Sequence, residues 1–395
     1  MAQAAIRTDN GFATDEAQAP GQRVALRRLS LTNFRSYSHV DVALDGRPVA
    51  IAGANGAGKT NFIEAISLIG PGRGLRSARL HELPRDAGDG GWAVSARLHD
   101  GEDEISLGVG AHSAKPERRV CRIEESSASG PSAFADHLRC LWLTPAQDRL
   151  FMEGAGERRK FLDRMTLAHN GGHAKASNAY EKAMRQRQRL LDEGRSDDEW
   201  LSGLEAQMAE AGVAIASARC NMVTMLAGAD ISGEVFPAAD IALDGDLETA
   251  LGENDPADVE REHADNLRAN RGIDAHAGRC LKGPHRSDLI VQHREKNQAA
   301  RLCSTGEQKA LLIGLVLANA RALAEHPGGA PIILLLDEIA AHLDPERRAG
   351  LFAIIDDLGL QAFMTGTDEA LFTAWGRRAQ CFAAENNTLC ETTFE

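Results

Sequence analysis

The sequence predicts an α/β protein in which both ends of the chain build one mixed sheet with flanking helices. Three features point to this fold. Residues 48–53 (PVAIAG) form a short apolar run that leads through a glycine-rich turn into a helical pattern at 60–69. A second apolar run, 332–336, ends at an acidic pair. Between them, residues 155–229 contain no proline and are rich in Glu, Arg, Gln, Ala and Leu, as helices are. We therefore expect an α/β head interrupted by a helical insert.

The N-terminal elements follow from the spacing of apolar residues. Residues 1–23 are short of large apolar side chains and rich in Ala, Gln, Asp and Gly, which predicts a disordered leader. Alternation of apolar and polar positions at 24–32 and at 40–44 predicts two strands. Residues 94–98 and 105–109 flank a polar turn, and this pattern predicts a hairpin.

The C-terminal half alternates between strand and helix patterns. A polar, helix-like stretch at 252–271 completes the insert. The elements expected after it are strands at 289–293, 332–336 and 361–365 and helices at 306–324 and 345–358. The predicted domains are the leader at 1–23, a head made of 24–150 plus 275–395, and a helical insert at 151–274.

Composition excludes several classes of protein. The formal net charge of −13 argues against a uniformly basic nucleic-acid coat, so any DNA contact must come from a local basic patch. Aromatic residues make up 5% of the chain, too few for base stacking to dominate binding. No apolar run approaches the roughly 18 residues of a membrane span, and no secretory signal is present, so we expect no membrane partner. Seven cysteines without a CxxC pair favour reduced thiols in the cytoplasm and no structural zinc.

The turn after the first apolar run matches the phosphate-binding pattern GxxxxGK[ST], with a strand before it and a helix after it. Its residues are Gly53, Ala54, Asn55, Gly56, Ala57, Gly58, Lys59 and Thr60, followed by Asn61. Glycines let successive backbone N–H groups turn inward around phosphate oxygens. We expect Lys59 to reach the β- and γ-phosphates, the Thr60 hydroxyl to hold Mg²⁺, and Asn61 to belong to the nucleotide site. The alternative is a glycine-rich turn that matches by chance.

The second motif is the acidic end of the strand at 332–336. A strand that lies beside the phosphate loop would bring Asp337 to the metal ion. Glu338, the next residue, would be placed to polarise an attacking water. This makes Glu338 and Lys59 the expected catalytic residues. The alternative is an acidic strand end that caps the following element.

A third motif, STGEQ at 304–308, opens a predicted helix. A serine at a helix start followed by glycine presents a hydroxyl, backbone N–H groups and a positive dipole end to an anion. We expect Ser304, Gly306 and Gln308 to contact the nucleotide. Taken alone, the motif is better explained as a plain N-cap with Glu307 as its partner. The order of motifs along the chain favours the nucleotide role.

These motifs together resemble the ABC-type ATPase heads of SMC, Rad50 and RecF proteins. The resemblance rests on LTNFRSY at 31–37, the phosphate loop, STGEQK, LLLDE, and HLD at 342–344. Over roughly residues 24–395 the match is to the RecF family. The stretches typical of that family are GPGRGLRSAR at 70–79, RRKFLD at 158–163 and GPHRSDL at 283–289. Between about 165 and 280 the likeness is mainly one of length and of helix-rich composition.

The resemblance implies an ABC-type head, with a mixed sheet and flanking helices, and a helical second lobe. It further implies an ATP-dependent homodimer with two ATP molecules between its chains. Ser304 and Gly306 would then act in trans on ATP held by Lys59, and Asp344 would lie in a loop that crosses the dimer interface.

The implied activity is ATP- and Mg²⁺-dependent DNA binding in recombinational repair and replication-fork maintenance. The dimer would clamp double-stranded, gapped or junction DNA, hydrolyse ATP slowly with stimulation by DNA, and help to load recombinase at gapped DNA. The implied partners are RecO and RecR, and the implied location is the cytoplasm, at the nucleoid.

Three positions depart from the family pattern or are ambiguous. RecF proteins commonly carry a second Asp where this chain has Glu338. Glu307 replaces the usual Gly or Gln of the third motif, and we expect Lys309 to neutralise it. Gln147, in LTPAQDRL, is our candidate for the glutamine that joins Thr60 and Asp337 at the metal ion, although a surface-loop glutamine explains it equally well.

Basic residues suggest where DNA could bind. Arg73, Arg76 and Arg79 recur every three residues in a glycine-rich loop, which suits phosphate contact without base readout, although a solvated charge run is an equal alternative. For a second cluster at 158–164 we favour structural or interlobe pairing with nearby Glu153, Glu157 and Asp163 over DNA contact. Arg185, Arg187 and Arg189 would form a diffuse basic surface on a helix. The segment 285–288 would be a hinge or a lobe interface, with a nucleotide-sensing role as the less favoured alternative.

Three other functions use a related head. An ABC transporter's ATP-binding subunit has a short helical insert, whereas here Lys59 and Ser304 lie far apart in the chain. A structural head of the SMC or Rad50 type needs hundreds of residues of coiled coil between its halves, and this insert has only about a hundred helix-rich residues. A nuclease would need a further acidic metal-binding domain after the head. The DNA-binding ATPase is therefore favoured.

Overall fold

The computed structural model describes residues 24–99, 101, 103–194, 197–229, 231, 235–325 and 330–394. The leader predicted at 1–23 lies outside these residues. The strands are β1 Ala25–Phe34, β2 Tyr37–Ala43, β3 Val49–Ala52, β4 Trp92–His99, β5 Glu104–His112, β6 Lys115–Ile123, β7 Ser126–Ala128, β8 Arg139–Leu143, β9 Ala239–Asp244, β10 Asp288–His293, β11 Gln298–Ala299, β12 Ile332–Leu336, β13 Gln361–Gly366, β14 Gln380–Glu385 and β15 Thr388–Thr392. The helices are α1 Lys59–Leu68, α2 Ala155–His169, α3 Gly172–Asp192, α4 Asp198–Gly228, α5 Asp246–Leu251, α6 Pro256–Ala269, α7 Arg271–Ala277, α8 Thr305–Ala324 and α9 Pro345–Asp357.

The core of the head is a mixed sheet with the strand order β15-β14-β3-β13-β12-β8. Strands β8, β12, β13, β3 and β14 run parallel, and β15 pairs antiparallel with β14. The apolar runs that predicted β3 and β12 are buried on both faces, as parallel strands are. One strand, β13, separates β3 from β12 and brings the ends of all three to the same edge of the sheet.

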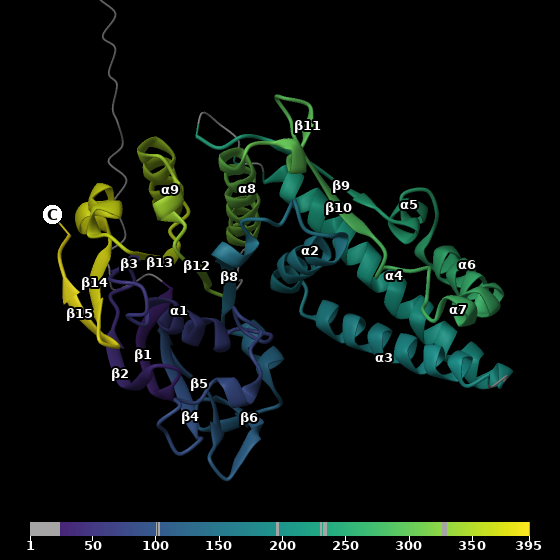
Figure 1. Ribbon diagram of the computed structural model, residues 1–395, viewed down its shortest axis with the longest axis horizontal. Helices are drawn as coiled ribbons and strands as arrows, with labels where there is room; N and C mark the ends of the chain where they lie inside the picture. The colour runs from purple at the N-terminus through teal and green to yellow at the C-terminus, as the bar shows by residue number, and fades with distance from the viewer. Residues whose placement is uncertain are drawn as a thin grey trace, which may run out of the picture.

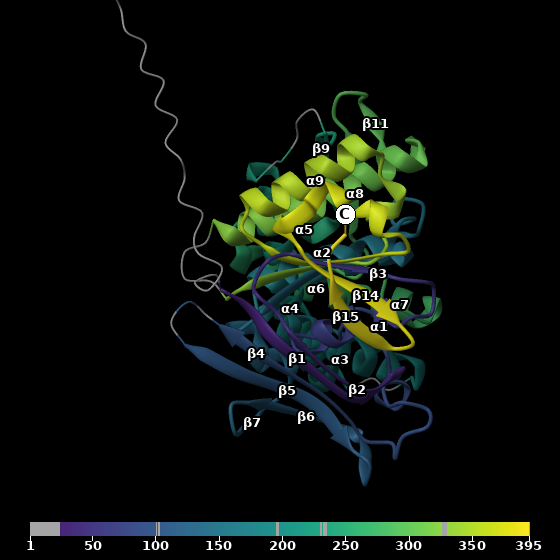
Figure 2. The same cartoon turned by 90° about the vertical axis from the view of Figure 1, so that its left-hand side faces the viewer.

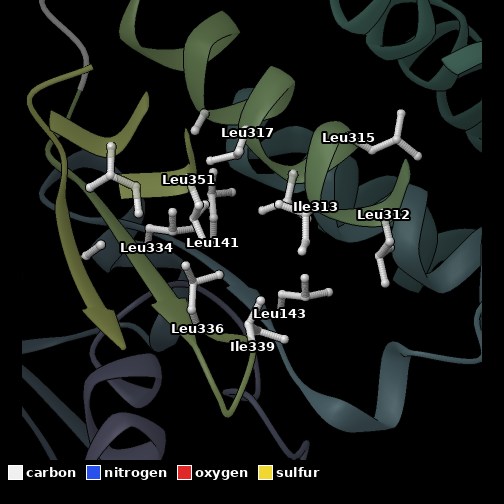
Figure 3. Close-up of a cluster of buried hydrophobic side chains, with 14 of the residues drawn as sticks. Leu141, Leu143, Leu312, Ile313, Leu315, Leu317, Leu334, Leu336, Ile339 and Leu351 are labelled. Atoms are coloured by element: carbon white, nitrogen blue, oxygen red, sulfur yellow. The ribbon is translucent and has the colours of Figure 1, made fainter. Parts of the chain in front are cut away.

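Alternate residues of β12 serve two different hydrophobic layers. Leu334 and Leu336 belong to a core with residues of α8 and α9, among them Ile313 and Leu351, as Figure 3 shows. On the opposite face, Ile333 and Leu335 pack in a cluster with α1 and with a second sheet. Figure 2 shows these layers, with α8 and α9 on one side of the core sheet and the second sheet on the other.

The second sheet is antiparallel, with the order β2-β1-β4-β5-β6-β7. On β4, the side chains of Trp92, Val94, Ala96 and Leu98 are buried and the residues between them are exposed. This alternation is the period-2 pattern that predicted the β4–β5 hairpin, and the hairpin is confirmed by its antiparallel register. The core sheet with its flanking helices is the α/β head that the sequence predicted, and the antiparallel sheet is a second layer that it did not predict.

The region between the halves of the head is mostly helical and extends to one side in Figure 1. The long helix α4 packs along α3 and α6. The predicted insert at 151–274 also contains β9, which pairs antiparallel with β10 of the predicted head segment. The division between head and insert stays a prediction.

Helix α4 is the one described helix that is long and apolar enough, by length and composition, to cross a membrane. It is nevertheless a core helix of the folded protein, because half of its most apolar 18-residue stretch is buried. It also carries buried charges that are paired: Glu205 with Arg187, and Arg219 with Asp163. Since Arg187 is only 1% exposed and also pairs with Asp274, the predicted basic surface on α3 is wrong at that position.

The cluster at 158–164 is structural, as predicted, but most of its partners differ from those predicted. Lys160 does pair with Glu157 at 2.6 Å. Arg158 instead pairs with Asp288 through two hydrogen bonds of 2.7 Å, and Arg159 donates to the carbonyl oxygen of Ser287. Arg164 stacks over the Trp142 ring, 4.7 Å from its centroid, and burial lowers its pKa to about 9. The segment 285–288 is therefore bound to α2, which fits the predicted lobe interface.

Candidate nucleotide-binding site

The phosphate loop folds between β3 and α1 at the edge of the core sheet where β13 and β12 also end. Gly53 N donates to Gly366 O at 3.2 Å and anchors the start of the loop to β13. Gly56 and Gly58 have φ of +84° and +101°, a region that favours glycine. A Cβ on Gly58 would lie 2.7 Å from the Tyr37 hydroxyl oxygen, which itself donates to Gly58 O at 3.1 Å. These glycines are required by the turn and by the close approach of Tyr37.

The Lys59 ammonium lies against the loop's own carbonyl groups. Its Nζ donates to Gly53 O at 2.7 Å and to Ala54 O at 3.0 Å, and the residue is 4% exposed. Burial lowers the pKa of Lys59, and the nearby charges of Glu338 and Asp337 oppose that shift. A cation held in this way can exchange carbonyl partners for phosphate oxygens, which are stronger acceptors for an ammonium.

Thr60 and Asp337 meet directly, although 277 residues separate them in the chain. The Thr60 hydroxyl donates to Asp337 Oδ1 at 2.9 Å. The Thr365 hydroxyl, at the end of β13, donates to the same oxygen at 2.7 Å. Asp337 N is fixed in turn by Leu143 O of β8 at 2.9 Å. The predicted pairing of the two motifs at the sheet edge is thus the arrangement that the chain adopts.

Glu338 follows Asp337 in the left-handed region, with φ of +55°. Such a conformation is strained for a residue with a side chain and needs support from its surroundings. That support is a hydrogen bond of 3.0 Å from Glu338 N to the Thr365 hydroxyl. The charge of Glu338 opposes the lowering of the Lys59 pKa by burial. The position of its carboxylate beside a γ-phosphate stays a prediction.

The residues at this edge fit a magnesium ion that is shared with a nucleotide. Among the described residues there is no group of three or more His, Cys, Asp or Glu side chains that could hold a metal by themselves. The Thr60 hydroxyl and the Asp337 carboxylate are both oxygen donors of the kind Mg²⁺ prefers. Phosphate oxygens and water must supply the other ligands, as is usual for Mg²⁺ in nucleotide sites.

Asn61 and Arg76 belong to a polar network on the outer side of α1. Asn61 Nδ2 donates to Ser36 Oγ at 2.9 Å, and Asn61 Oδ1 accepts from Arg76 at 2.9 Å. Arg76 also pairs at 2.8 Å with Glu64, which is 1% exposed and grips Arg35 through two further hydrogen bonds. The network ties the glycine-rich loop at 70–79 to the helix that carries Lys59 and Thr60.

The other two arginines of that loop are placed differently. Arg73 and Arg79 are exposed, as Arg76 is, but no described ion pair ties them to α1. Arg73 also lines a cavity of about 460 Å³ between the loop, the segment after β8 and helices α2 and α3. Of the three arginines predicted to contact DNA, only Arg76 is in an ion pair with a buried carboxylate.

Gln147 lies four residues beyond β8, the strand that pairs with β12. Its Oε1 accepts from Thr144 N at 3.1 Å within its own turn. The side chain also lines the 460 Å³ cavity. The turn is thus adjacent to Asp337, but the described contacts of Gln147 stay within the turn, and its role at the metal stays a prediction.

The third motif forms the N-terminus of α8. Ser304 is the N-cap, and its hydroxyl and backbone N–H both donate to Glu307 Oε2 at 2.9 Å. The cation beside Glu307 is Lys296, so the expectation that Lys309 neutralises it is wrong. Lys309 pairs instead with Asp148 at 2.9 Å. Lys296 and Ser304 together lower the pKa of Glu307 to about 2, so this carboxylate is charged at neutral pH.

The three predicted nucleotide residues of this motif differ in exposure. Ser304 and Gly306 are exposed, and a Cβ on Gly306 would meet nothing within 4 Å. Gln308 is 5% exposed and donates to Cys303 O at 2.9 Å, so its amide faces the interior of the protein. The described contacts of Ser304 stay within its own motif and do not reach the phosphate loop of the same chain.

Asp344 is the N-cap of α9 and accepts from Arg347 N at 2.8 Å. It is exposed and follows the turn after Glu338, as does exposed His342. The loop that we expect to cross a dimer interface is therefore on the surface.

Three residues of the site carried no prediction. Thr365 joins both acidic residues, Glu64 holds the loop arginine, and Tyr37 supports the phosphate loop. The available signals were a threonine at the end of an apolar strand and a glutamate one helical turn after Thr60. Neither signal is specific without the pairing of strands and loops in space.

Comparison with known proteins identifies the family of the chain. The chain matches the family described as RecF/RecN/SMC N terminal domain over residues 25–389. It is 50% identical over 372 residues to the DNA replication and repair protein RecF of Mesorhizobium japonicum, covering 93% of this chain and 98% of that one. The RecF protein of Brucella abortus is 50% identical over 376 residues, covering 94% of this chain and 97% of its own length.

Solved structures extend the comparison to three dimensions. The recombination mediator protein RecF of the RecFOR pathway, in the structure RecF-ATP, superposes with a TM-score of 0.80 and 21% identity. That match covers 94% of this chain and 98% of the other. The structure RecF-ATPrS of the same mediator gives the same TM-score over 95% of this chain. A family match over nearly the whole chain, with relatives sharing half of its residues, shows that the chain belongs to the RecF family of DNA replication and repair proteins, within the RecF/SMC ATPases.

Proposed function

We propose that this chain is an ATP-dependent DNA-binding protein of recombinational repair and replication-fork maintenance. ATP binding drives two chains into a DNA clamp, and slow, DNA-stimulated hydrolysis resets it. The observation that carries the proposal is the hydrogen bond of 2.9 Å between Thr60 and Asp337, which joins the phosphate loop to the acidic strand end. The RecF relatives supply the biological setting.

ATP binding follows from the loop's geometry. Backbone N–H groups of the turn and the N-terminus of α1 would face the phosphates, and Lys59 would exchange its carbonyl partners for phosphate oxygens. Thr60 and Asp337 would hold Mg²⁺, which neutralises charge on the β- and γ-phosphates when bound. Of these residues, Lys59 and Thr60 are contiguous at the start of α1, so one rigid element positions both.

Hydrolysis would depend on Glu338. Its left-handed turn would hold the carboxylate beside the γ-phosphate, where it would orient and polarise a water molecule. A transition state whose charge rests on the phosphoryl oxygens would be stabilised by Lys59 and the metal ion.

Dimerisation would complete each site. Ser304 and Gly306 are exposed at the N-terminus of a 20-residue helix, whose positive end suits a γ-phosphate from another chain. Their described contacts do not reach the phosphate loop of their own chain. Exposed Asp344 would lie in the same interface. The resulting assembly is a homodimer with two ATP molecules between its chains.

DNA would be bound through its phosphates, because a chain with a net charge of −13 can attract DNA only through local basic patches. Exposed Arg73 and Arg79 are the simplest contacts. Duplex, gapped and junction DNA are the proposed ligands, and RecO and RecR are the proposed protein partners of this cytoplasmic protein, because relatives of the chain act in the RecFOR pathway.

Light scattering of the purified chain tests this proposal. The mass should double with ATP and Mg²⁺ and stay that of one chain with ADP or with ATP and EDTA. Addition of a gapped duplex should stabilise the ATP-bound dimer. A chain whose mass does not respond to ATP, under conditions where it binds ATP, would rule out the clamp.

A further inference from the structure

Thr365 occupies the position between the two halves of the nucleotide site. It lies near the end of β13, the strand between β3, which leads into the phosphate loop, and β12, which leads into Asp337. Thr365 pairs in register with Ile51 of β3, and its neighbour Met364 pairs with Leu336 of β12. The residue is fully buried, so its hydroxyl must find partners inside the protein.

The hydroxyl of Thr365 has two partners, and both belong to the acidic pair. It donates its single hydrogen to Asp337 Oδ1 at 2.7 Å. It accepts a hydrogen bond of 3.0 Å from Glu338 N. One oxygen atom thus fixes the carboxylate of the expected metal ligand and the backbone of the expected catalytic residue.

A role in shaping the strand does not explain this hydroxyl. Valine has nearly the same shape as threonine and at least as strong a preference for strands, and the residues before Thr365 in β13 include buried Phe363 and Met364. Removing the hydroxyl would leave Glu338 in its left-handed conformation with its N–H without that acceptor. The Thr365 hydroxyl therefore stabilises the acidic pair, Asp337 and Glu338, rather than the sheet.

Asp337 has a second donor, on the phosphate loop. The Thr60 hydroxyl also donates to Asp337 Oδ1. A hydroxyl can coordinate a cation through a lone pair and still donate its hydrogen, so this bond would join two groups that both contact the metal. Thr365 reaches the same oxygen from the neighbouring strand and also holds Glu338 N.

We propose that Thr365 is a positioning residue for hydrolysis of Mg²⁺-bound ATP: its hydroxyl holds Asp337 ready for the metal and Glu338 in its strained, water-facing turn. This inference rests on the proposed function, since it assigns a role within the same site.

Thr365→Val and Thr365→Ser test the assignment, with Thr166→Val as the matched control. Thr166 is a buried threonine too, 2% exposed, but its hydroxyl donates to Leu162 O within α2, away from the site. Three quantities are measured on each full-length chain: the Kd for ATP with Mg²⁺, the Kd for ATP with EDTA, and the steady-state kcat and KM against Mg²⁺. Thermal unfolding of each variant reports its stability.

We expect Thr365→Val to weaken Mg²⁺-dependent ATP binding and to lower kcat, each by about 10-fold or more, since residues that orient a metal ligand typically contribute that much. Its Kd for ATP with EDTA should match the parent. Thr365→Ser, which keeps the hydroxyl, should restore both quantities, and Thr166→Val should change neither. If Thr365→Val is too unstable to measure, Thr365→Ala removes the hydroxyl with a smaller side chain and must show the same selective defect.

Two results overturn the inference. One is a Thr365→Val chain with the parent's Mg²⁺ dependence and kcat. The other is a defect that is equal with and without Mg²⁺, or that Thr365→Ser shares, because a general packing fault would produce it. If the parent chain itself neither binds nor hydrolyses ATP, the proposed function fails and the inference falls with it; this outcome is distinct from a parent that is active and a variant that is unaffected.

Discussion

Arg76 Nη1 lies 2.8 Å from Glu64 Oε2, so one of the three arginines predicted to contact DNA is bound to a carboxylate on the helix that begins with Lys59. Glu64 is 1% exposed and is also gripped by Arg35. A buried carboxylate needs such cations, because burial without them is costly. All three loop arginines are exposed, but Arg76 alone among them pairs with a carboxylate of α1 in the described contacts.

This division predicts different effects for two equivalent substitutions. Arg76→Ala should lower the free energy of unfolding by about 1 kcal/mol, since Glu64 keeps Arg35 but loses a partner. Arg73→Ala should leave stability unchanged and weaken DNA binding, with a salt slope reduced by about one. Chemical denaturation and DNA binding at several salt concentrations measure both. Equal stability of the two variants would contradict the structural role of Arg76.

The elements that could be predicted from sequence are those whose pattern is local. Strand β12 and helix α9 were predicted within one residue of their bounds, because an apolar run and a Pro after an Asp cap mark them. Strands β8 and β14 carried no prediction, although both belong to the core sheet. Their short runs, RCLWL and QCFAAE, show neither a clean alternation nor a flanking turn signal.

The residues of the site also divide into those that the sequence reveals and those that it does not. Lys59, Thr60 and Asp337 could be identified because each belongs to a motif of consecutive residues. The structure joins the two motifs through the hydrogen bond between Thr60 and Asp337. Thr365 and Glu64 were not identified, since their roles depend on which strands and loops become neighbours. The partner of Glu307 was assigned to Lys309, near in sequence, but the fold brings Lys296 to it from the segment after β10. Sequence spacing within a helix could not reveal that contact.

Lys59→Met should abolish ATP hydrolysis and weaken binding of Mg²⁺-bound ATP. The reason is that the substitution keeps a long side chain but removes the only cation that donates to Gly53 O and Ala54 O among the described contacts. We expect a loss of at least about 100-fold in kcat. Lys59→Arg should also fail, because a planar guanidinium does not replace a compact ammonium.

Lys160→Met, on an exposed lysine that pairs with Glu157, is the control and should behave as the parent. Parent-like turnover in Lys59→Met would remove Lys59 from the site.

Glu338→Gln should hydrolyse ATP much more slowly, by about 100-fold or more, while still binding it. The amide keeps the backbone bond to Thr365 and leaves Thr60 and Asp337 in place, so nucleotide and metal binding should persist. The variant should therefore accumulate as an ATP-bound dimer in light scattering. A variant that hydrolyses ATP at the parent rate would show that another group polarises the water.

His263 should make the protein less stable in weak acid. Burial chiefly, with help from His285 and Arg187, lowers the pKa of His263 from 6.5 to about 4. The unfolded chain therefore binds a proton at this position before the folded chain does. The stabilisation from neutral His263 is fully present above about pH 6.5 and is lost as the pH falls towards 4, by about 3 kcal/mol at most.

Denaturant unfolding between pH 7 and pH 4 measures this effect. His263→Leu should lose less stability over that range than the parent, while His276→Leu, on an exposed histidine of α7, should follow the parent curve. Parallel curves for the parent and His263→Leu would contradict the assignment.

The central claim is that Ser304 of one chain completes the site that holds Lys59 in the other. Ser304→Arg should leave ATP binding by a single chain nearly unchanged, because the described contacts of Ser304 do not reach its own phosphate loop. A long cation at this exposed position should block dimerisation by its bulk. The most direct measurement mixes Ser304→Arg chains with Lys59→Met chains, each inactive alone, and follows ATP hydrolysis. We expect partial recovery of ATP hydrolysis on mixing, because a mixed dimer contains one site with an intact lysine from one chain and an intact serine from the other. No recovery, together with loss of nucleotide binding in Ser304→Arg alone, would mean that Ser304 serves its own chain and would contradict the clamp.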